Sequence, residues 1–308
     1  MNIKREKNKH AKIVLPPDSR YEIKTPDHLF EHHVIFLAVG PRGASKTTKI
    51  CNYLRMMRQA DKLDRLICVS PTITSNQSLL QSLGVKPEDC FEPTADATKK
   101  VLAIVDEERD TYQDFLNKDD AYHEYQKAIN SNTPISQLSP YTLLDATDDW
   151  GNPQKPISRY GHRPIIAVFM DDCQSTPALG ARAFSRMCLT HRHVGALEYE
   201  KGGGRSGEKK GALGISIFMA AQNFKASGSG VRREIRNNCT QLCLCGKSKD
   251  AAEKKSIYKS VSGNVTEEQF NTAMDYATEE KYGSLIIDFH PKSPSKRFRK
   301  NFDEYIEI

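Results

Sequence analysis

The chain has 308 residues, of which 38% are hydrophobic and 27% charged, with a formal net charge of +6; this balance is typical of a folded globular protein. Its longest apolar runs, residues 34–39 and 165–170, are too short to span a bilayer, and residues 1–12 are too polar for a secretory signal. The composition therefore excludes fibrous and membrane-spanning classes, and we expect an intracellular protein.

Short apolar runs alternate along the chain with amphipathic stretches. The runs lie at residues 34–39, 66–69, 165–170, 215–221, 241–245 and 284–289. They do not alternate apolar with polar side chains, which is typical of buried, parallel strands. Helical periodicity predicts helices at residues 46–59, 75–83, 98–115, 121–129, 178–189 and 267–276. This order predicts an α/β three-layer sandwich around a mostly parallel central sheet.

The chain is predicted to consist of a basic N-terminal arm, residues 1–30, and one large domain, residues 31–308. Residues 130–164 are dense in Pro, Asn and Ser, and residues 197–213 are rich in glycine and basic side chains, so we expect two surface insertions. Near the end of the chain, Phe298, Phe302 and Tyr305 lie among basic residues, which we interpret as a final strand and tail.

Basic side chains gather at residues 4–12, 201–210 and 292–300. Such clusters suit a polyanionic partner, because Lys and Arg displace counterions from phosphates. Solvated tails and a flexible loop would give the same composition, so charge alone does not decide between them.

The eight cysteines include no CxxC pair, and we expect most of them to be small buried hydrophobic side chains in a reducing compartment. Cys188, His191 and His193 lie close together in the sequence, but a fourth zinc ligand at suitable spacing is missing. A structural role is therefore favoured for them.

The first predicted strand leads directly into a glycine-containing loop and then into a helix. The loop consists of Gly40, Pro41, Arg42, Gly43, Ala44, Ser45, Lys46, Thr47 and Thr48. In this arrangement, backbone amides and the helix N-terminus hold phosphates. Lys46 is expected to reach the β- and γ-phosphates of ATP, and the Thr47 hydroxyl to ligate Mg²⁺. Ser45 stands where glycine is usual, and its side chain restricts the backbone.

Two adjacent acids, Asp171 and Asp172, end the apolar run at residues 165–170, which is the Walker B form. Asp171 is predicted to hold Mg²⁺ through water, and Asp172 to orient and polarise the attacking water. Paired acids also occur in solvated turns and helix caps, but the upstream phosphate loop favours the functional interpretation. Gln222 ends the run at residues 215–221 and is predicted to sense the γ-phosphate, the alternative being a plain strand-end cap.

Six arginines follow these two strands: Arg182, Arg186, Arg192, Arg232, Arg233 and Arg236. An arginine that reaches the γ-phosphate of a neighbouring subunit stabilises charge in the transition state. Arginines on a helix surface are usually just solvated, so the pattern alone does not single one out.

Taken in order, the segments GPRGASKT, FMDDCQST, THRHVG, IFMAAQNF and IRNNCTQL resemble the genome-packaging ATPases of nucleocytoplasmic large DNA viruses and virophages, in the FtsK–HerA group of P-loop motors. The resemblance covers roughly residues 31–246. It implies a sheet of the additional-strand (RecA/FtsK-like) type, the paired acids at Walker B and a catalytic role for Gln222. It also matches an RH pair at Arg192 and an RNN-like motif at Arg236, which makes these two the candidate catalytic arginines.

The resemblance implies a homo-oligomeric ring that hydrolyses ATP with Mg²⁺ and translocates double-stranded DNA into a capsid through its portal vertex. It places the protein in a cytoplasmic virus factory or the nucleus of the host cell, or in the virion. A basic loop containing Lys201, Arg205, Lys209 and Lys210 is predicted to grip DNA phosphates without reading sequence.

Three other functions share parts of this pattern. A nucleotide or small-molecule kinase also has a phosphate loop, but kinases usually bring an arginine-bearing lid and lack the paired acids followed by a strand-end glutamine. A helicase or mobilisation ATPase would translocate on nucleic acid without packaging it. A scaffold that binds ATP without turnover is disfavoured by the intact set of Lys46, Thr47, Asp171 and Asp172.

Overall fold

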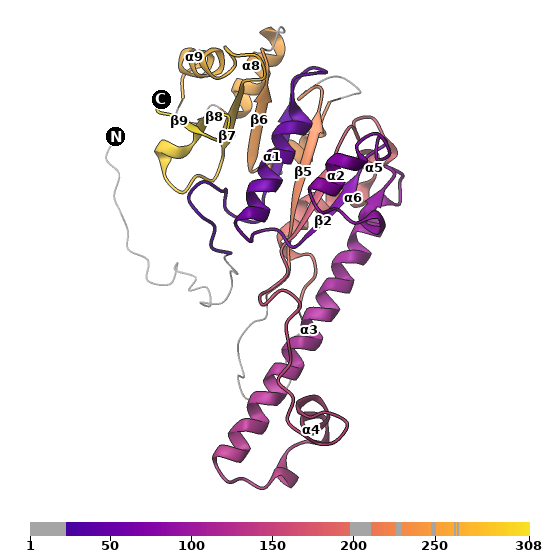
Figure 1. The fold of residues 1–308 in the computed structure, drawn as a ribbon. Coiled ribbons are helices and arrows are strands. Elements are labelled where there is room, and N and C mark those ends of the chain that lie inside the picture. The colour runs from indigo at the N-terminus through magenta and orange to yellow at the C-terminus, as the bar shows by residue number, and fades with distance from the viewer. Residues whose placement is uncertain (1–22, 198–210, 226–229, 248–250, 262, 264) are drawn as a thin grey trace, which may run out of the picture.

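The structure is a computed structural model that describes residues 23–197, 211–225, 230–247, 251–261, 263 and 265–308 (Figure 1). Within these residues a nine-stranded sheet has the order β3-β2-β4-β5-β1-β6-β7-β8-β9. The strands are Ile35–Val39 (β1), Arg65–Val69 (β2), Cys90–Phe91 (β3), Ile166–Met170 (β4), Ile215–Ala221 (β5), Gln241–Cys245 (β6), Ser284–Asp288 (β7), Phe298–Lys300 (β8) and Glu304–Ile306 (β9).

The sheet is parallel from β3 to β6 and antiparallel from β6 to β9. Strand β5 lies between β1, which leads into the glycine loop, and β4, which ends at the paired acids. A strand inserted between these two is the mark of the additional-strand type. The predicted fold class, a three-layer sandwich with a mostly parallel sheet, is therefore confirmed.

Helices cover both faces of the sheet (Figure 1). They are Lys46–Gln59 (α1), Gln77–Ser82 (α2), Ala97–Asn130 (α3), Pro140–Ala146 (α4), Pro177–Gly180 (α5), Arg182–Thr190 (α6), Arg233–Asn238 (α7), Ala251–Val261 (α8) and Glu267–Ala277 (α9). Short 3-10 turns occur at Pro87–Asp89 (η2), Ile135–Gln137 (η3), His191–His193 (η4) and Pro294–Lys296 (η5).

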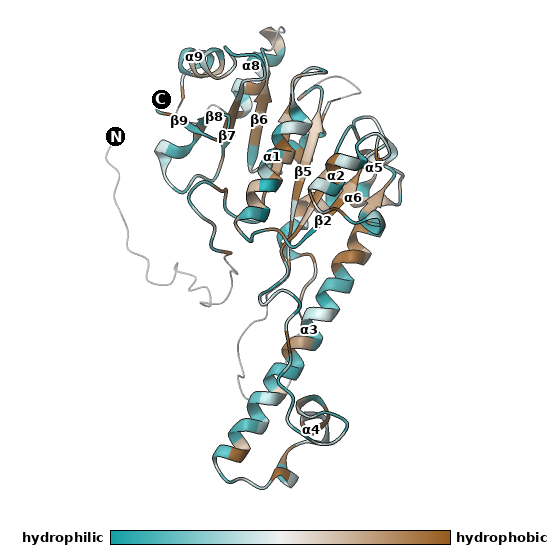
Figure 2. Ribbon diagram, in the orientation of Figure 1, coloured by the Kyte–Doolittle hydropathy of each residue, from teal (hydrophilic) through white to brown (hydrophobic). Residues whose placement is uncertain are grey.

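Each central strand contributes to two separate cores. On β1, Phe36 and Ala38 pack with the apolar residues of α1 and α2 on one face. Ile35 and Leu37 pack on the other face with the first turns of α3 and with α6 to α9. Because both faces are covered, β1 carries an apolar side chain at every position, and Figure 2 shows that the centre of the sheet is largely hydrophobic.

The body of the molecule includes residues that precede the predicted boundary at residue 31. Leu29 and Phe30 are buried, and the Phe30 amide donates a 2.8 Å hydrogen bond to the Tyr53 hydroxyl of α1. Residues 1–22 of the predicted N-terminal arm lie outside the described residues, as do residues 198–210, which include the predicted DNA-gripping residues Lys201, Arg205, Lys209 and Lys210. In the part of the chain that the structure describes, no helix is both long and apolar enough to cross a membrane.

Helix α3 differs from the expectation of two helices at residues 98–115 and 121–129. It is one continuous helix of 34 residues, which at 1.5 Å per residue is about 51 Å long. Its early turns pack on the sheet, and its later turns extend away from the body with α4 against them (Figure 1). The polar residues between the two predicted helices lie on this extension, where Lys118 pairs with Asp114 at 2.8 Å. We call residues 106–152 the projection.

A buried ion cluster fixes the root of the projection. The Arg65 guanidinium of β2 contacts Asp89 at 2.8 Å and Glu108 of α3 at 2.9 Å. The same Glu108 oxygen accepts hydrogen bonds from Arg159 at 3.0 Å and the Tyr160 hydroxyl at 3.2 Å, both in the segment that returns from the projection. Glu108 is fully buried, so both chain segments of the root are attached to one carboxylate.

Removing that carboxylate should destabilise the whole fold. In Glu108→Ala, Arg65 keeps Asp89 but loses half of its pairing in a buried site, and we expect the free energy of unfolding to fall by about 3 kcal/mol. Denaturant unfolding would measure the loss. Glu107→Ala is the matched control, because Glu107 lies 3.6 Å from the same guanidinium but its side chain is 62% exposed. Equal losses in both variants would contradict the assigned role of Glu108.

Candidate functional site

The glycine loop lies at the carboxyl end of β1, where two glycines meet different requirements. A Cβ on Gly40 would lie 2.3 Å from the Cys245 carbonyl oxygen of β6, so only glycine allows the loop to pass this close to the next strand. Gly43 has a φ of +80°, in the left-handed region that favours glycine. The loop therefore lies directly against the end of the neighbouring strand β6.

Ser45, directly before α1, has a φ of 64° and also lies in the left-handed region. This backbone conformation explains why glycine is usual at the position, since a residue with a Cβ is strained there by about 1–2 kcal/mol. The Ser45 hydroxyl oxygen is buried without a hydrogen-bond partner within the described residues. The loop nevertheless adopts the conformation that the glycine would allow.

Lys46 folds back over the loop. Its ammonium donates hydrogen bonds to the carbonyl oxygens of Gly40 at 2.8 Å and Pro41 at 2.9 Å. Burial lowers the pKa of this ammonium, while the nearby Asp171 and Asp172 act in the opposite direction. A cation is thus held directly above the loop amides, as required of a group that binds a terminal phosphate.

Thr47 and Asp171 meet across the sheet edge. The Thr47 hydroxyl donates a 2.8 Å hydrogen bond to the Asp171 carboxylate, which is only 5% exposed. Burial raises the pKa of Asp171, and the bond from Thr47 opposes that rise. Hydroxyl and carboxylate oxygens are the hard ligands that Mg²⁺ prefers, and a cation here would offset the cost of burying the carboxylate. The residues therefore fit the predicted magnesium site.

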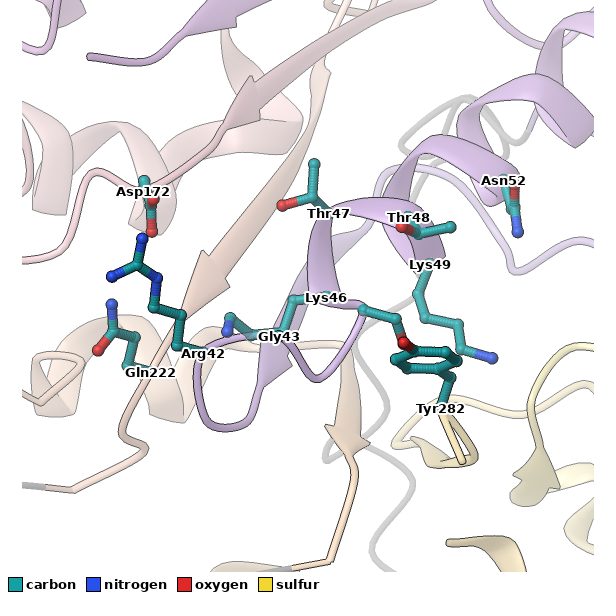
Figure 3. A pocket seen from close by; sticks show the side chains of 11 residues that line it. Arg42, Gly43, Lys46, Thr47, Thr48, Lys49, Asn52, Asp172, Gln222 and Tyr282 are labelled. Carbon is teal, nitrogen blue, oxygen red and sulfur yellow. The ribbon is translucent and has the colours of Figure 1, made fainter. Parts of the chain in front are cut away.

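A pocket of about 780 Å³ opens in front of the loop (Figure 3). Its lining consists of Arg42, Gly43, Ser45, Lys46, Thr47, Thr48, Lys49, Asn52, Asp172, Gln222 and Tyr282. In Figure 3 Arg42, Asp172 and Gln222 lie together at one end, and Tyr282 lies beside Lys49 at the other. Three cationic side chains face a single carboxylate, so the pocket favours an anionic ligand.

The structure brings some predicted catalytic residues together and leaves others apart. Lys46, Asp172 and Gln222 share the pocket. Arg192 lies exposed on η4, which contacts β5 and precedes the end of that strand that is remote from the loop, so it does not share the pocket. Arg236 bonds the Phe224 carbonyl oxygen at 3.1 Å and lines a separate cavity of about 440 Å³. The catalytic role of both arginines stays a prediction.

Three pocket residues, Lys49, Asn52 and Tyr282, were not found by sequence reasoning. Lys49 follows the motif by two positions and bonds Asn301 from the C-terminal part of the chain. Tyr282 comes from the turn after α9 and is 51% exposed on the pocket wall. None of the three belongs to a motif. Tyr282 reaches the pocket only because β7, which follows it in the chain, pairs with β6.

The cysteine and histidine expectations can be compared with the structure directly. Seven of the eight cysteines are buried, Cys90 is partly exposed, and all eight are free thiols. Among the described residues, no group of three or more His, Cys, Asp or Glu side chains could hold a metal ion. Cys188 and His191 are buried, with the His191 ring 2.9 Å from the Cys188 carbonyl oxygen, which is a structural contact.

The additional strand, the loop beneath Lys46 and the Thr47–Asp171 pair together define the class of P-loop NTPases. No protein-family model matches the chain, and no curated protein matches it. Among solved structures it is similar to the genome packaging NTPase B204 from Sulfolobus turreted icosahedral virus 2. With AMPPCP bound, that structure is 12% identical with a TM-score of 0.45, over 87% of this chain and 96% of that one.

The chain is similar to two further solved structures at comparable identity. B204 in complex with ATP-gammaS is 11% identical, with a TM-score of 0.42 over 89% of this chain and 98% of that one. The cytoplasmic domain of the Thermomonospora curvata Type VII secretion ATPase EccC is 13% identical, with a TM-score of 0.38 over 89% of this chain and 24% of that one.

Replacing Ser45 with glycine should stabilise the protein. Ser45→Gly relieves the left-handed strain and removes a buried hydroxyl without a partner, and we expect the free energy of unfolding to rise by about 1 kcal/mol. Ser45→Ala is the control, because it removes the hydroxyl but keeps the strained Cβ. Denaturant unfolding of both variants would test this; a loss of stability in Ser45→Gly would show that the strain argument is wrong.

Tyr282 should contribute to nucleotide binding through its ring. A stacked aromatic ring contributes about 1 kcal/mol, so Tyr282→Ala should weaken ATP binding about fivefold. Calorimetric titration would measure the change, and Tyr282→Phe, which keeps the ring, should bind like the unmodified chain. If Tyr282→Phe binds as weakly as Tyr282→Ala, the hydroxyl rather than the ring makes the contact.

Proposed function

We propose that this protein is a Mg²⁺-dependent ATPase that couples hydrolysis to the translocation of double-stranded DNA into a viral capsid. The observation that carries the ATPase part is the convergence of Lys46, the Thr47–Asp171 pair and Asp172 at one pocket. The packaging part is supported by the ordered set of motifs between residues 40 and 242, together with the net charge of +6. The partners would then be double-stranded DNA and the capsid or its portal. The protein would act in a virus-infected cell.

The two adjacent acids have different roles because their surroundings differ. Asp171 is buried and bonded to Thr47, so it is suited to hold Mg²⁺. Asp172 is exposed at the pocket rim, where it can accept a hydrogen bond from a water molecule and orient it toward the terminal phosphate. Both acids follow the last residue of β4, and Asp172 has a φ of 52°, in the left-handed region, so the chain turns at the second acid and separates the two functions.

The remaining pocket residues position the phosphates and respond to them. Mg²⁺ held by Thr47 and Asp171 would neutralise charge on the β- and γ-phosphates. The loop amides and Lys46 bind the same phosphates from the other side. Gln222 directly follows β5, and its backbone N–H donates a hydrogen bond to the Gln174 side-chain oxygen, so a movement at Gln222 would be passed to the segment after β4.

ATP hydrolysis should depend on Lys46 and rise with DNA. Removing the ammonium from the pocket should lower the hydrolysis rate at least about 100-fold in Lys46→Ala, since it removes a cation aimed at the developing charge. Hydrolysis by the purified protein would be measured with and without blunt double-stranded DNA. Lys86→Ala is the control, because that side chain is 51% exposed and remote from the pocket.

Different outcomes separate the alternatives. Hydrolysis that persists in Lys46→Ala would contradict the assigned site. Lysine-dependent hydrolysis that does not respond to DNA would contradict translocation and favour transfer to a small phosphate acceptor. Stimulation by DNA with separation of the strands would favour a helicase over a packaging motor.

A further inference from the structure

The end of the projection exposes several large apolar side chains. Tyr141 is 79% exposed and Leu144 75% exposed, and they lie three residues apart on one face of α4. Trp150, the single tryptophan of the chain, is 88% exposed just after that helix. Exposed apolar groups gathered in this way mark interaction surfaces rather than ordinary surface positions. We call Tyr141, Leu144, Trp150 and the acids Asp145 and Asp149 the tip.

The tip is held in an ordered conformation. Ser139 caps α4 by accepting a 3.0 Å hydrogen bond from the Thr142 amide. Asp148 accepts bonds from the amides of Trp150 at 2.9 Å and Asn152 at 2.8 Å, which fixes the turn that carries the tryptophan. The opposite face of α4 is anchored by Ala146, which packs against Tyr125 of α3. An ordered surface binds with a smaller loss of entropy than a flexible one.

Charge selects the kind of partner. Residues 106–152 contain eleven acidic and three basic side chains, whereas the rest of the chain contains 28 acidic and 42 basic ones. The projection therefore repels nucleic acid and attracts a basic protein surface. Figure 2 shows that its long helix is mostly hydrophilic beyond the body, so the apolar side chains are concentrated near its end.

Helix α6 of the same chain has a surface with the complementary chemistry. Arg182, Arg186 and Leu189 follow at i, i+4 and i+7, so they share one face, and all three are exposed. Leu189 is 55% exposed, although Phe184 and Met187 on the opposite face are buried in the core. Two further arginines, Arg232 and Arg233, are exposed at the start of α7, which packs beside α6.

The tip cannot reach this surface within its own molecule. Val101 of α3 shares a core with α6, and Ala121, against which α4 packs, lies twenty residues later. At 1.5 Å per residue, about 30 Å of straight helix separates them. The buried cluster at Glu108 fixes the root between the two, so α3 cannot fold back toward α6.

We propose that the tip docks on the exposed face of α6 in a second copy of this chain. Asp145 and Asp149 pair with Arg182 and Arg186, and the aromatic rings cover Leu189 and the aliphatic parts of the arginines. Since donor and acceptor are different surfaces, the contact is head-to-tail and builds a ring or an open chain rather than a twofold dimer. The inference rests on the proposed function in one respect, since it supplies a contact for the homo-oligomeric ring that the resemblance implies, but the contact itself needs no nucleotide.

Charge reversal on each side would test the contact by sedimentation of the full chain over a range of concentrations. Asp145→Arg with Asp149→Arg makes both surfaces basic, and Arg182→Glu with Arg186→Glu makes both acidic. Each double variant alone should associate at least about 100-fold more weakly, because like charges then face each other. An equal mixture should assemble again, because every tip then meets a surface of opposite charge.

The matched control is Glu267→Arg with Glu268→Arg, a reversal of two exposed acids on α9, which should leave assembly unchanged. Circular dichroism would check that each variant is folded. An unmodified chain that stays monomeric, a tip variant that assembles normally, or a mixture that does not recover would each overturn the proposal. Binding of the tip to a capsid protein without self-association would also overturn it. Because no nucleotide is present, these outcomes are distinguishable from a failure of the proposed ATPase.

Discussion

The hydrogen bond between Thr47 and Asp171 depends on the order of the whole sheet. Thr47 lies in the first turn of α1, which follows the loop after β1, and Asp171 follows β4, which is not a neighbour of β1 because β5 lies between them. The two side chains meet only because these strands are parallel and end at the same edge. The Gly40 amide bonds the Ala221 carbonyl oxygen at 3.2 Å, which fixes the loop to the intervening strand. The loop is thus positioned by β5 and β6 on either side.

Burial at this edge of the sheet shifts the pKa values of Asp171 and Lys46 in opposite directions. Asp171 and Lys46 are both buried, and burial raises the pKa of the carboxyl and lowers that of the ammonium, so each charge is costly without its partners. A phosphate group with its metal ion supplies the missing opposite charges to both at once. Burying the charges of Asp171 and Lys46 costs free energy, and a metal-bound polyphosphate offsets that cost. The two groups therefore make the pocket selective for such a ligand.

Features formed by residues close together in the sequence could be predicted from it. The strand, loop and start of α1 were correct because glycine spacing, Lys46 and Thr47 act within a few residues, and Asp171 follows its own strand. Tyr282 could not be found in this way, since it reaches the pocket only through pairing of β6 with β7. The predicted break within α3 was wrong for a physical reason. Residues 117–120, between the turns that pack on the body and the turns that pack against α4, are all polar, so the apolar periodicity is interrupted although the backbone stays helical.

The net charge of +6 conceals a separation of charge between two parts of the molecule. The projection is acidic and the remainder is basic, so a surface for phosphates and a surface for a second protein copy need not compete. Salt would act on them differently. Binding to DNA releases counterions and weakens steeply with salt, whereas a contact that also buries Tyr141, Leu144 and Trp150 keeps its apolar contribution when charges are screened. Assembly through the projection would therefore persist at ionic strengths that release a polyanion.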